Sequence, residues 1–496
     1  MNLNVLLAGV PVRKMFQTLF GKMASTHDVM VSGIRYDSRT VERGNVFVAL
    51  RGDATDGHRY IGEAIARGAK VVVTEDDMNP PDPLCMHTGT VKLVVDDTRR
   101  ALALMASNFY GRPADKLRVI GITGTNGKTT TAYLIKQMLE WDGTRKSGLI
   151  GTVEYMIGAR VIPATHTTPE SLELHGLFRQ MVDEGCTHAV MEVSSHALAQ
   201  ERVYGIPFAA GVFTNLTQDH LDYHGTMEAY FEAKKTLFDM LSPDAAAIVN
   251  ADSSYGMRIV SDTNARVVTY GIESEEARLR ALHLRTSQAG SEAEVDGMAV
   301  KTALSGRFNM LNLLGAYAAV KSVVPEFSLP AEAFAELKPA PGRFELFRSM
   351  KGWTAIVDYA HTHDAITNCL ETIRQIVPAG SNETVTIVFG AGGDRDRQKR
   401  PLMGRAAERL SDRVIVTSDN PRTEDPMEII RGITSGMEHP ERAVVEPDRA
   451  RAIALALEGA NAGDIILIAG KGHEDYQVIG TEKIHLSDKE LVRRHL

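Results

Sequence analysis

The segment Val119–Thr130 constrains the fold of this chain more than any other stretch. An apolar run ends in a turn that contains Gly124 and Gly127, and a pattern typical of a helix begins at Lys128. A strand, a phosphate-binding loop and a helix N-terminus follow one another in this way in nucleotide-binding α/β domains. Backbone N–H groups reach a phosphate only where side chains are absent, and the lysine supplies a positive charge. The segment therefore predicts an α/β domain that binds ATP.

The sequence of this loop departs from the general phosphate-loop motif, because Ile122 occupies the position of the first glycine of that motif. A turn without a ligand is the alternative, but such a turn gives no reason for a lysine directly after Gly127. The run Thr123–Thr130 resembles the nucleotide loop of the Mur ligases, the ATP-dependent amide-forming enzymes of peptidoglycan precursor synthesis, and of their relatives that add glutamate to folate. The resemblance implies an ATP-binding set: Gly124, Thr125, Asn126, Gly127, Lys128, Thr129 and Thr130.

Length and composition allow about three domains, since the chain has 496 residues and 44% hydrophobic content. A net charge of −8 gives no general attraction to nucleic acid or to an anionic membrane. The three cysteines show no metal-binding spacing. No signal peptide is recognisable, and no segment reaches the ~20 apolar residues of a membrane span. We expect a cytoplasmic monomer that acts on small molecules, with neither nucleic acid nor membrane as a partner.

The first domain, residues 1–97, is predicted to be a small α/β unit. Val46–Leu50 and Val71–Val73 have the pattern of buried strands, and Ile61–Ala66 that of a helix between them. Polar clusters typical of turns lie between the strands. The order of these clusters resembles the Mur-ligase segment that receives the uridine nucleotide, and the resemblance assigns Ser38 to that substrate.

The second domain, residues 98–343, is built on the phosphate loop and is expected to be a parallel sheet like that of P-loop ATPases. Thr168 and Pro169 suit the N-cap and the first position of a helix. A strand pattern carries Glu192 near its C-terminal end, where ligands of parallel sheets bind. A buried carboxylate needs a partner, and magnesium prefers oxygen ligands.

The densest group of polar residues follows, between Asp219 and Lys234. It resembles the Mur-ligase motif in which a histidine binds a second magnesium ion and a downstream lysine is carbamylated by CO₂. The resemblance implies these roles for His220 and for Lys234 as N6-carboxylysine, whereas a solvated helix-face lysine is the alternative. A carbamate offers the carboxylate that an ammonium lacks.

The same resemblance assigns the remaining residues of the second domain. It implies a catalytic set of Lys128, Glu192, His220 and Lys234, and ligands to two magnesium ions at Thr129, Glu192, His220 and Lys234. It implies sugar-nucleotide contacts at Ser38, Thr167, Thr168, Ser194, Gln200 and Arg202, and further nucleotide contacts at Asn309 and Asn312.

The third domain, residues 344–496, is predicted to be a Rossmann-like, doubly wound parallel sheet. Four apolar strands each run into a polar motif, and helical stretches lie between them, so the motifs are expected on one edge of the sheet. The strands are Ala355–Val357, Val385–Phe389, Val414–Thr417 and Ile465–Ile468.

The motif Asp419–Arg422 separates members of the family. Asp-Asn-Pro-Arg resembles the signature of the Mur ligases that add meso-diaminopimelate, and the lysine-adding enzymes generally lack the arginine. Diaminopimelate carries a carboxylate that lysine lacks, and Arg422 offers it a bidentate partner. The resemblance gives an amino-acid set of Arg395, Asp419, Asn420, Pro421, Arg422, Gly470 and Glu474. His363 and Ala391 replace the family's usual proline and cysteine, and neither change removes a group with an assigned role.

The resemblance extends over all three domains and implies an amide ligase. Its expected substrates are ATP, UDP-MurNAc-L-Ala-D-Glu and meso-diaminopimelate, joined through an acyl phosphate. Three alternatives remain: a lysine-adding ligase, a folate-polyglutamylating ligase and a nucleotide-binding module without turnover. The first domain argues against the folate enzyme, Arg422 argues against lysine, and the intact catalytic set argues against the module.

Overall fold

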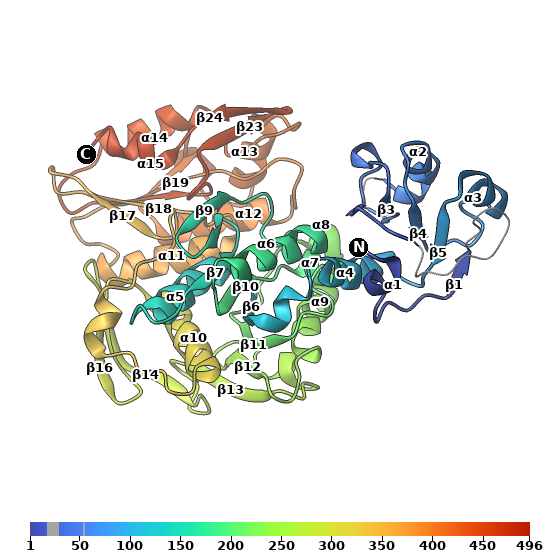
Figure 1. The fold of residues 1–496 in the computed structure, drawn as a ribbon. Helices are drawn as coiled ribbons and strands as arrows, with labels where there is room; N and C mark the ends of the chain where they lie inside the picture. Colours follow the sequence, from blue (N-terminus) through green and yellow to red (C-terminus); the bar gives the residue numbers. More distant parts are fainter. Residues whose placement is uncertain (17–28, 53–54) are drawn as a thin grey trace. The chain divides into compact units, whose positions relative to one another are not determined.

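The computed structural model describes residues 1–16, 29–52 and 55–496 (Figure 1). The chain forms two compact units. The first unit comprises residues 1–120 and 145–208, and the second comprises residues 121–144 and 209–496. The chain therefore crosses from one unit to the other three times, and the first crossing lies within strand β6 (Arg118–Thr123).

The first unit begins with a five-stranded sheet in the order β1-β5-β4-β3-β2. Its strands are β1 (Lys14–Phe16), β2 (Gly33–Arg35), β3 (Asn45–Val48), β4 (Val71–Thr74) and β5 (Val91–Val94), all parallel except β1. Its helices are α1 (Leu3–Leu6), α2 (Ile61–Ala66), α3 (Asp82–Thr88) and α4 (Thr98–Phe109). The predicted strands and helix of this region are confirmed.

Strand β3 shows why the strands of this sheet have continuous apolar sequences. Val46 and Val48 pack into a core that includes α4, whereas Phe47 packs with α2 on the opposite face. Because both faces are covered, every position of β3 is buried.

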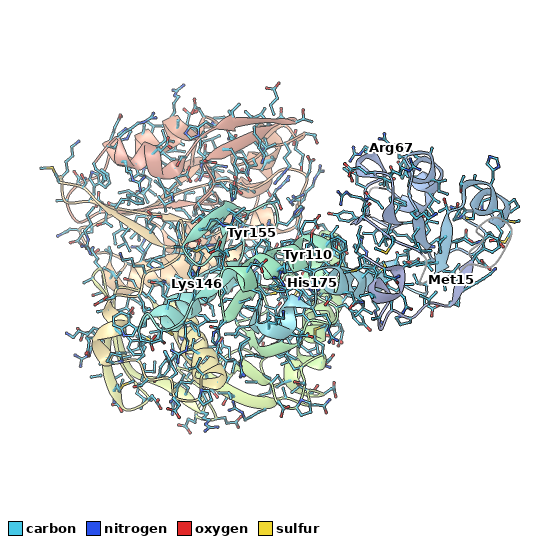
Figure 2. All side chains as sticks on the ribbon, in the orientation of Figure 1. Met15, Arg67, Tyr110, Lys146, Tyr155 and His175 are labelled. Atoms are coloured by element: carbon cyan, nitrogen blue, oxygen red, sulfur yellow. The ribbon has the colours of Figure 1, made fainter. Side chains whose placement is uncertain are left out.

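The remainder of the first unit consists of strands and helices from 145–208. The strands are β7 (Ser147–Ile150), β8 (Glu154–Ile157), β9 (Arg160–Pro163) and β10 (His188–Glu192), and the helices are α6 (Ser171–Asp183) and α7 (Ser195–Ala199). β10 pairs in parallel with β7, and β8 and β9 extend that pair antiparallel. Tyr110, the residue after α4, is labelled in Figure 2. Its ring would lie 3.3 Å from a Cβ at Gly176 of α6, so a glycine at that position lets the ring pack on the helix.

The predicted cap of α6 is wrong. The helix begins at Ser171 with Glu170 as its N-cap, so Pro169 does not occupy the first helical position. The Thr168 hydroxyl instead donates to the backbone oxygen of Glu192, 2.8 Å away. A contact with a distant strand has replaced the local cap that the sequence favours.

The second unit begins with a mixed sheet in the order β16-β15-β14-β13-β12-β11-β6. Its strands are β11 (Phe208–Phe213), β12 (Ala246–Asn250), β13 (Arg266–Gly271), β14 (Leu279–Ser287), β15 (Gly290–Val295) and β16 (Met298–Thr302). Its helices are α5 (Lys128–Glu140), α8 (Leu221–His224), α9 (Met227–Asp239) and α10 (Arg307–Val323). The predicted parallel sheet is confirmed for β11 to β14, and β14, β15 and β16 add an antiparallel extension to it.

The second unit continues with a six-stranded sheet in the order β17-β18-β22-β19-β20-β21. Its strands are β17 (Glu345–Arg348), β18 (Thr354–Asp358), β19 (Val385–Phe389), β20 (Arg413–Val416), β21 (Val444–Val445) and β22 (Ile465–Ala469). The helices are α11 (His363–Ile376), α12 (Lys399–Leu410), α13 (Pro426–Thr434), α14 (Arg449–Glu458) and α15 (Asp488–Arg493). A hairpin of β23 (Tyr476–Ile479) and β24 (Glu482–His485) is separate. The four predicted strands are confirmed, and only the edge strand β17 is antiparallel.

Within the described part of the chain, no helix combines the length and the apolar character that crossing a bilayer requires.

Candidate active site

The phosphate loop lies between β6 and α5, as predicted, and two of its positions require glycine. Gly124 and Gly127 have φ of +149° and +86°. A Cβ at Gly127 would collide with the side chain of Asn312, and one at Gly124 would collide with that of Thr214. The backbone at these two positions is therefore packed closely on its neighbours and has no side chain, which is the form that phosphate loops have.

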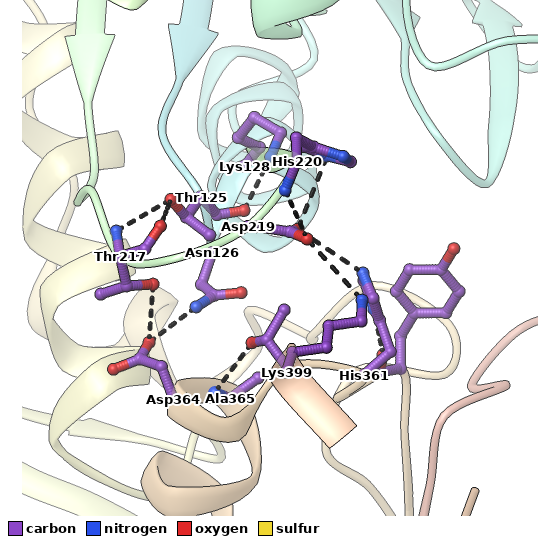
Figure 3. Close-up of polar contacts among 12 residues, drawn as sticks. Thr125, Asn126, Lys128, Thr217, Asp219, His220, His361, Asp364, Ala365 and Lys399 are labelled. Atoms are coloured by element: carbon purple, nitrogen blue, oxygen red, sulfur yellow. Dashed lines mark hydrogen bonds and ion pairs between the residues drawn. The ribbon is translucent and has the colours of Figure 1, made fainter. Parts of the chain in front are cut away.

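Lys128 and Thr129 open helix α5 beside this loop. Lys128 Nζ donates to the backbone oxygens of Gly124 and Thr125 at 2.9 and 2.8 Å (Figure 3). The Thr129 hydroxyl accepts a hydrogen bond from Arg343, at 3.0 Å. The ammonium and the hydroxyl thus lie at the helix N-terminus, where the helix dipole also favours an anion.

The remaining loop residues are held by the segment that follows β11. Thr125 N donates to Asn215 O at 2.9 Å, and its hydroxyl contacts Thr217 O and the Tyr230 hydroxyl. Thr130 is buried in α5. Asn309 and Asn312 share one buried face of α10, as expected from their spacing, and Asn312 Nδ2 donates to Asn309 Oδ1 at 3.5 Å.

A carboxylate of helix α11 joins the phosphate loop to the third-domain region. Asp364 accepts hydrogen bonds from Asn126 Nδ2 at 2.7 Å and from the Thr217 hydroxyl at 3.3 Å (Figure 3). Sequence reasoning gave Asp364 no role, because no local pattern marks a contact between residues 126 and 364.

Asp219 is the centre of a polar cluster in front of these residues. Its carboxylate lies 3.5 Å from His220 Nε2, 3.9 Å from His361 Nε2 and 3.7 Å from Lys399 Nζ (Figure 3). Burial alone would raise the pKa of Asp219, but the charge of Lys399, joined at acid pH by the protonated His220 and His361, outweighs burial and holds that pKa below its ordinary value. Burial and Lys399 lower the pKa of His361 to about 4, so His361 is neutral near pH 7.

Lys234 is fully buried beneath the phosphate loop. Its Nζ donates to Gly124 O at 2.9 Å and lies 4.4 Å from the centroid of the Tyr230 ring. Burial, and then the charge of Lys128, lower the pKa of Lys234 well below its ordinary value. The solvated helix-face alternative is therefore wrong for Lys234, whereas the neighbouring Lys235 pairs with Asp239 and Asp262.

Glu192 belongs to the first unit and ends strand β10 as predicted. Its two carboxylate oxygens accept hydrogen bonds from the backbone N and the hydroxyl of Thr152, at 2.8 and 3.0 Å. The Thr152 hydroxyl lies 3.1 Å from that of Thr167, and Thr168 bridges Glu192 O and Ser194. Thr167, Thr168 and Ser194 therefore gather around the end of β10.

A cavity of about 580 Å³ lies in the first unit and brings together Ser38, Gln200 and Arg202. Arg202 donates to Gln200 Oε1 at 2.7 Å and to Thr168 O at 2.8 Å. Arg99 and Arg202 each lie 3.5 Å from one carboxylate oxygen of Glu170. Both arginines line the cavity, and their guanidinium groups are donors that suit an anionic ligand.

The predicted amino-acid residues gather at the carboxyl ends of β19, β20 and β22. Arg422 donates to Gly393 O at 2.7 Å, and its backbone N donates to Val478 O of β23. Asn420 Nδ2 donates to Glu474 Oε2 at 2.9 Å. Gly470 has φ of +117°, and a Cβ there would lie 3.0 Å from Asp419 Oδ2. Arg395 is exposed and donates to Asp394 O, and Pro421 is buried.

The donor set of the predicted metal ligands suits magnesium, since it includes the Glu192 carboxylate and the Thr129 hydroxyl. Among residues 1–16, 29–52 and 55–496, no three His, Cys, Asp or Glu side chains are grouped as a protein-only metal cage. Magnesium at nucleotide sites takes only one or two carboxylates and completes its shell with phosphate and water.

Comparisons with known proteins agree with this arrangement. A family model described as "Mur ligase middle domain" matches residues 122–320. Models described as "Mur ligase, glutamate ligase domain" and "Mur ligase family, catalytic domain" match residues 342–472 and 30–110.

Individual relatives match over nearly the whole chain. A UDP-N-acetylmuramoyl-L-alanyl-D-glutamate–2,6-diaminopimelate ligase of Phocaeicola vulgatus is 45% identical over 93% of this chain and 94% of its own. The enzyme of the same description from Parabacteroides distasonis is 44% identical over 94% of each chain. A solved structure of an enzyme with that description is 34% identical, covers 95% of this chain and 96% of its own, and has a TM-score of 0.65.

Proposed function

The chain belongs to the Mur ligase family, and we propose that it joins meso-2,6-diaminopimelate to the D-glutamyl γ-carboxylate of UDP-MurNAc-L-Ala-D-Glu, with ATP as co-substrate. This reaction is a step of peptidoglycan precursor synthesis. We assign residues 1–97 to the sugar nucleotide, residues 98–343 to ATP and residues 344–496 to the amino acid. Because its substrates are cytoplasmic metabolites, we place the enzyme in the cytoplasm, and we propose that it acts as a monomer.

The choice of diaminopimelate as the amino acid rests on the position of Arg422 in the loop after β20. Arg422 has φ of +53° and is held by Gly393 and by β23, so its guanidinium is fixed at the site. A fixed guanidinium suits the distal carboxylate of diaminopimelate, which lysine lacks. Glu474 suits the distal ammonium, and Arg395, Asp419, Asn420, Pro421 and Gly470 complete the site. A lysine-adding enzyme would leave Arg422 without its ligand.

ATP activates the carboxylate in the proposed mechanism. The glutamyl carboxylate attacks the γ-phosphorus of ATP, the bond to ADP breaks, and an acyl phosphate forms. The amine of diaminopimelate then attacks the acyl carbon and phosphate leaves, while the amine loses a proton. Lys128 and the loop N–H groups stabilise the charge on the transferred phosphoryl group, and Gly124, Thr125, Asn126, Gly127, Thr130, Asn309 and Asn312 hold the nucleotide.

The proposed enzyme uses two magnesium ions. The residues that would hold them are Thr129, Glu192, His220 and carbamylated Lys234. When bound, magnesium supplies positive charge to the phosphates. Carbamylation is supported by the environment of Lys234, because burial favours the neutral amine, which is the form that reacts with CO₂.

We assign the cavity of the first unit to the sugar nucleotide. Ser38, Gln200 and Arg202 line this cavity, and the guanidinium groups of Arg99 and Arg202 suit the diphosphate. Thr167, Thr168 and Ser194 lie at the end of β10 and complete the proposed set.

The experiment that tests this function is phosphate release from ATP in mixtures that omit one substrate at a time. We expect release only when the sugar nucleotide and meso-diaminopimelate are both present, together with a product whose mass equals that of the two joined minus water. Nucleotide binding without release in the complete mixture would instead identify a binding module.

A further inference from the structure

Lys471 is a fully buried lysine in the loop after β22, and the mechanism above gives it no task. Its Nζ donates to Asn420 Oδ1 at 3.2 Å and to Glu474 Oε2 at 3.1 Å, and it forms an ion pair with Asp419 Oδ1 at 3.6 Å. The ammonium therefore has two hydrogen-bond acceptors and one further ion-pair partner. All three partners belong to the proposed amino-acid site.

These contacts join two loops that are not neighbours in the sheet. Asp419 and Asn420 follow β20, whereas Lys471 and Glu474 follow β22, and β19 lies between those strands. Lys471 therefore connects the two loops across an intervening strand. It does so together with the hydrogen bond from Asn420 Nδ2 to Glu474 Oε2, and it is the only one of these two contacts that also reaches Asp419.

Lys471 also fixes the direction in which the neighbouring polar groups point. Asn420 Oδ1 accepts from Lys471 and from Val478 N at 2.9 Å, so its Nδ2 is left to donate to Glu474. Glu474 Oε2 accepts from both Asn420 and Lys471. Among the described residues no hydrogen bond reaches Glu474 Oε1, so this is the oxygen that a substrate ammonium can use.

We infer that Lys471 is a positioning residue for the diamino acid: it holds Glu474 and Asn420 in the orientation that receives the distal ammonium, without touching the substrate itself. The inference rests on the proposed function. It assigns to Lys471 the task of separating two carboxylates, Asp419 and Glu474, whose mutual repulsion would otherwise distort the site.

A second buried lysine shows what a purely structural role looks like. Lys92 in β5 is also fully buried, but its Nζ donates to the backbone oxygens of Asp77 and Pro80 and to Asp82. None of these acceptors belongs to a proposed binding set. Lys92 is therefore the matched control for Lys471.

The test compares Lys471→Met with Lys92→Met by steady-state kinetics and thermal unfolding. We expect Lys471→Met to raise KM for meso-diaminopimelate by about tenfold or more, with KM for ATP and for the sugar nucleotide within about twofold of the wild type. We expect Lys92→Met to lower the unfolding temperature but to leave KM for diaminopimelate unchanged. A folded Lys471→Met with an unchanged KM for diaminopimelate, or with all three KM values raised equally, would overturn the inference.

A double variant covers the case in which Lys471→Met does not fold. Lys471→Met combined with Glu474→Gln removes one of the two carboxylates that Lys471 pairs with, and thereby their mutual repulsion. We expect its KM for diaminopimelate to match that of Glu474→Gln alone, because Lys471 acts on the substrate through Glu474. If the two substitutions raised KM for diaminopimelate independently, so that their effects multiplied in the double variant, this role would be contradicted. If the wild type itself fails to use diaminopimelate, the proposed function is wrong, whereas a normal wild type with a normal Lys471→Met refutes only the inference.

Discussion

Asp364 illustrates how much of this site depends on single residues far from the phosphate loop in sequence. Its carboxylate receives the side chains of Asn126, Thr217 and Asn368 at 2.7, 3.3 and 3.2 Å. Asn126 belongs to the phosphate loop, Thr217 to the segment that holds this loop, and Asn368 to the same helix as Asp364. One carboxylate on α11 therefore contacts side chains of the phosphate loop and of the segment beside it.

We predict that Asp364→Ala raises KM for ATP by about tenfold, because charge-assisted hydrogen bonds to Asn126 and Thr217 are lost. Glu371→Ala is the control, since Glu371 is exposed on the same helix. Titration of initial rates with ATP measures the effect. Equal KM values for the two variants would show that Asp364 does not order the loop.

Helix α6 carries a histidine that the proposed function does not use. His175 is buried, and neither ring nitrogen has a hydrogen-bond partner among the residues that the structure describes. Its ring packs edge-on against Phe178, with a centroid distance of 5.9 Å (Figure 2 labels His175). Burial lowers the pKa of His175 from 6.5 to about 4.

We predict that His175→Leu stabilises the protein, because two unsatisfied nitrogens leave the core; the gain is about 1–2 kcal/mol in the free energy of unfolding near pH 7. Below pH 6.5 the histidine becomes protonated in the unfolded chain but stays neutral in the folded chain. The free energy of unfolding of the wild type therefore falls by a further ~2 kcal/mol by pH 5, and that of the variant does not. Urea unfolding of both proteins at the two pH values measures this. A variant that is less stable at both would contradict the assignment.

The secondary-structure elements differ in how well the sequence predicts them. Strands β3, β4, β18, β19, β20 and β22 were predictable because helices cover both faces and each strand is a continuous apolar run. The start of α6 was not, because the Thr168 hydroxyl binds Glu192 O rather than capping the helix. The antiparallel extension of β14–β16 has no distinguishing motif. The contact of Asp364 with Asn126 could not be predicted, because only the tertiary fold brings the two residues together. The loop glycines and the Asp-Asn-Pro-Arg motif could be predicted, because each is a local sequence pattern.

For the whole molecule, buried histidines predict a common sensitivity to acid. Burial lowers the pKa of His175, His188 and His361 to about 4 and that of His473 to about 3. A folded-state pKa below the unfolded value of 6.5 means that stability is present above pH 6.5 and is lost as pH falls toward 4.

These histidines are divided between the two units, so we expect both units to lose stability in the same pH window. Urea unfolding at a series of pH values between 7 and 4 measures it. A free energy of unfolding that stays constant over this window would contradict the burial of these neutral side chains.

The central claim is that the chain selects diaminopimelate through a fixed guanidinium. The most direct measurement supplies meso-diaminopimelate or L-lysine to the wild type and to Arg422→Ala, with ATP and UDP-MurNAc-L-Ala-D-Glu, and records phosphate release. We predict a strong preference of the wild type for diaminopimelate and its loss in Arg422→Ala, a change of about tenfold or more in relative kcat/KM. Equal use of both amino acids by the wild type would contradict this account.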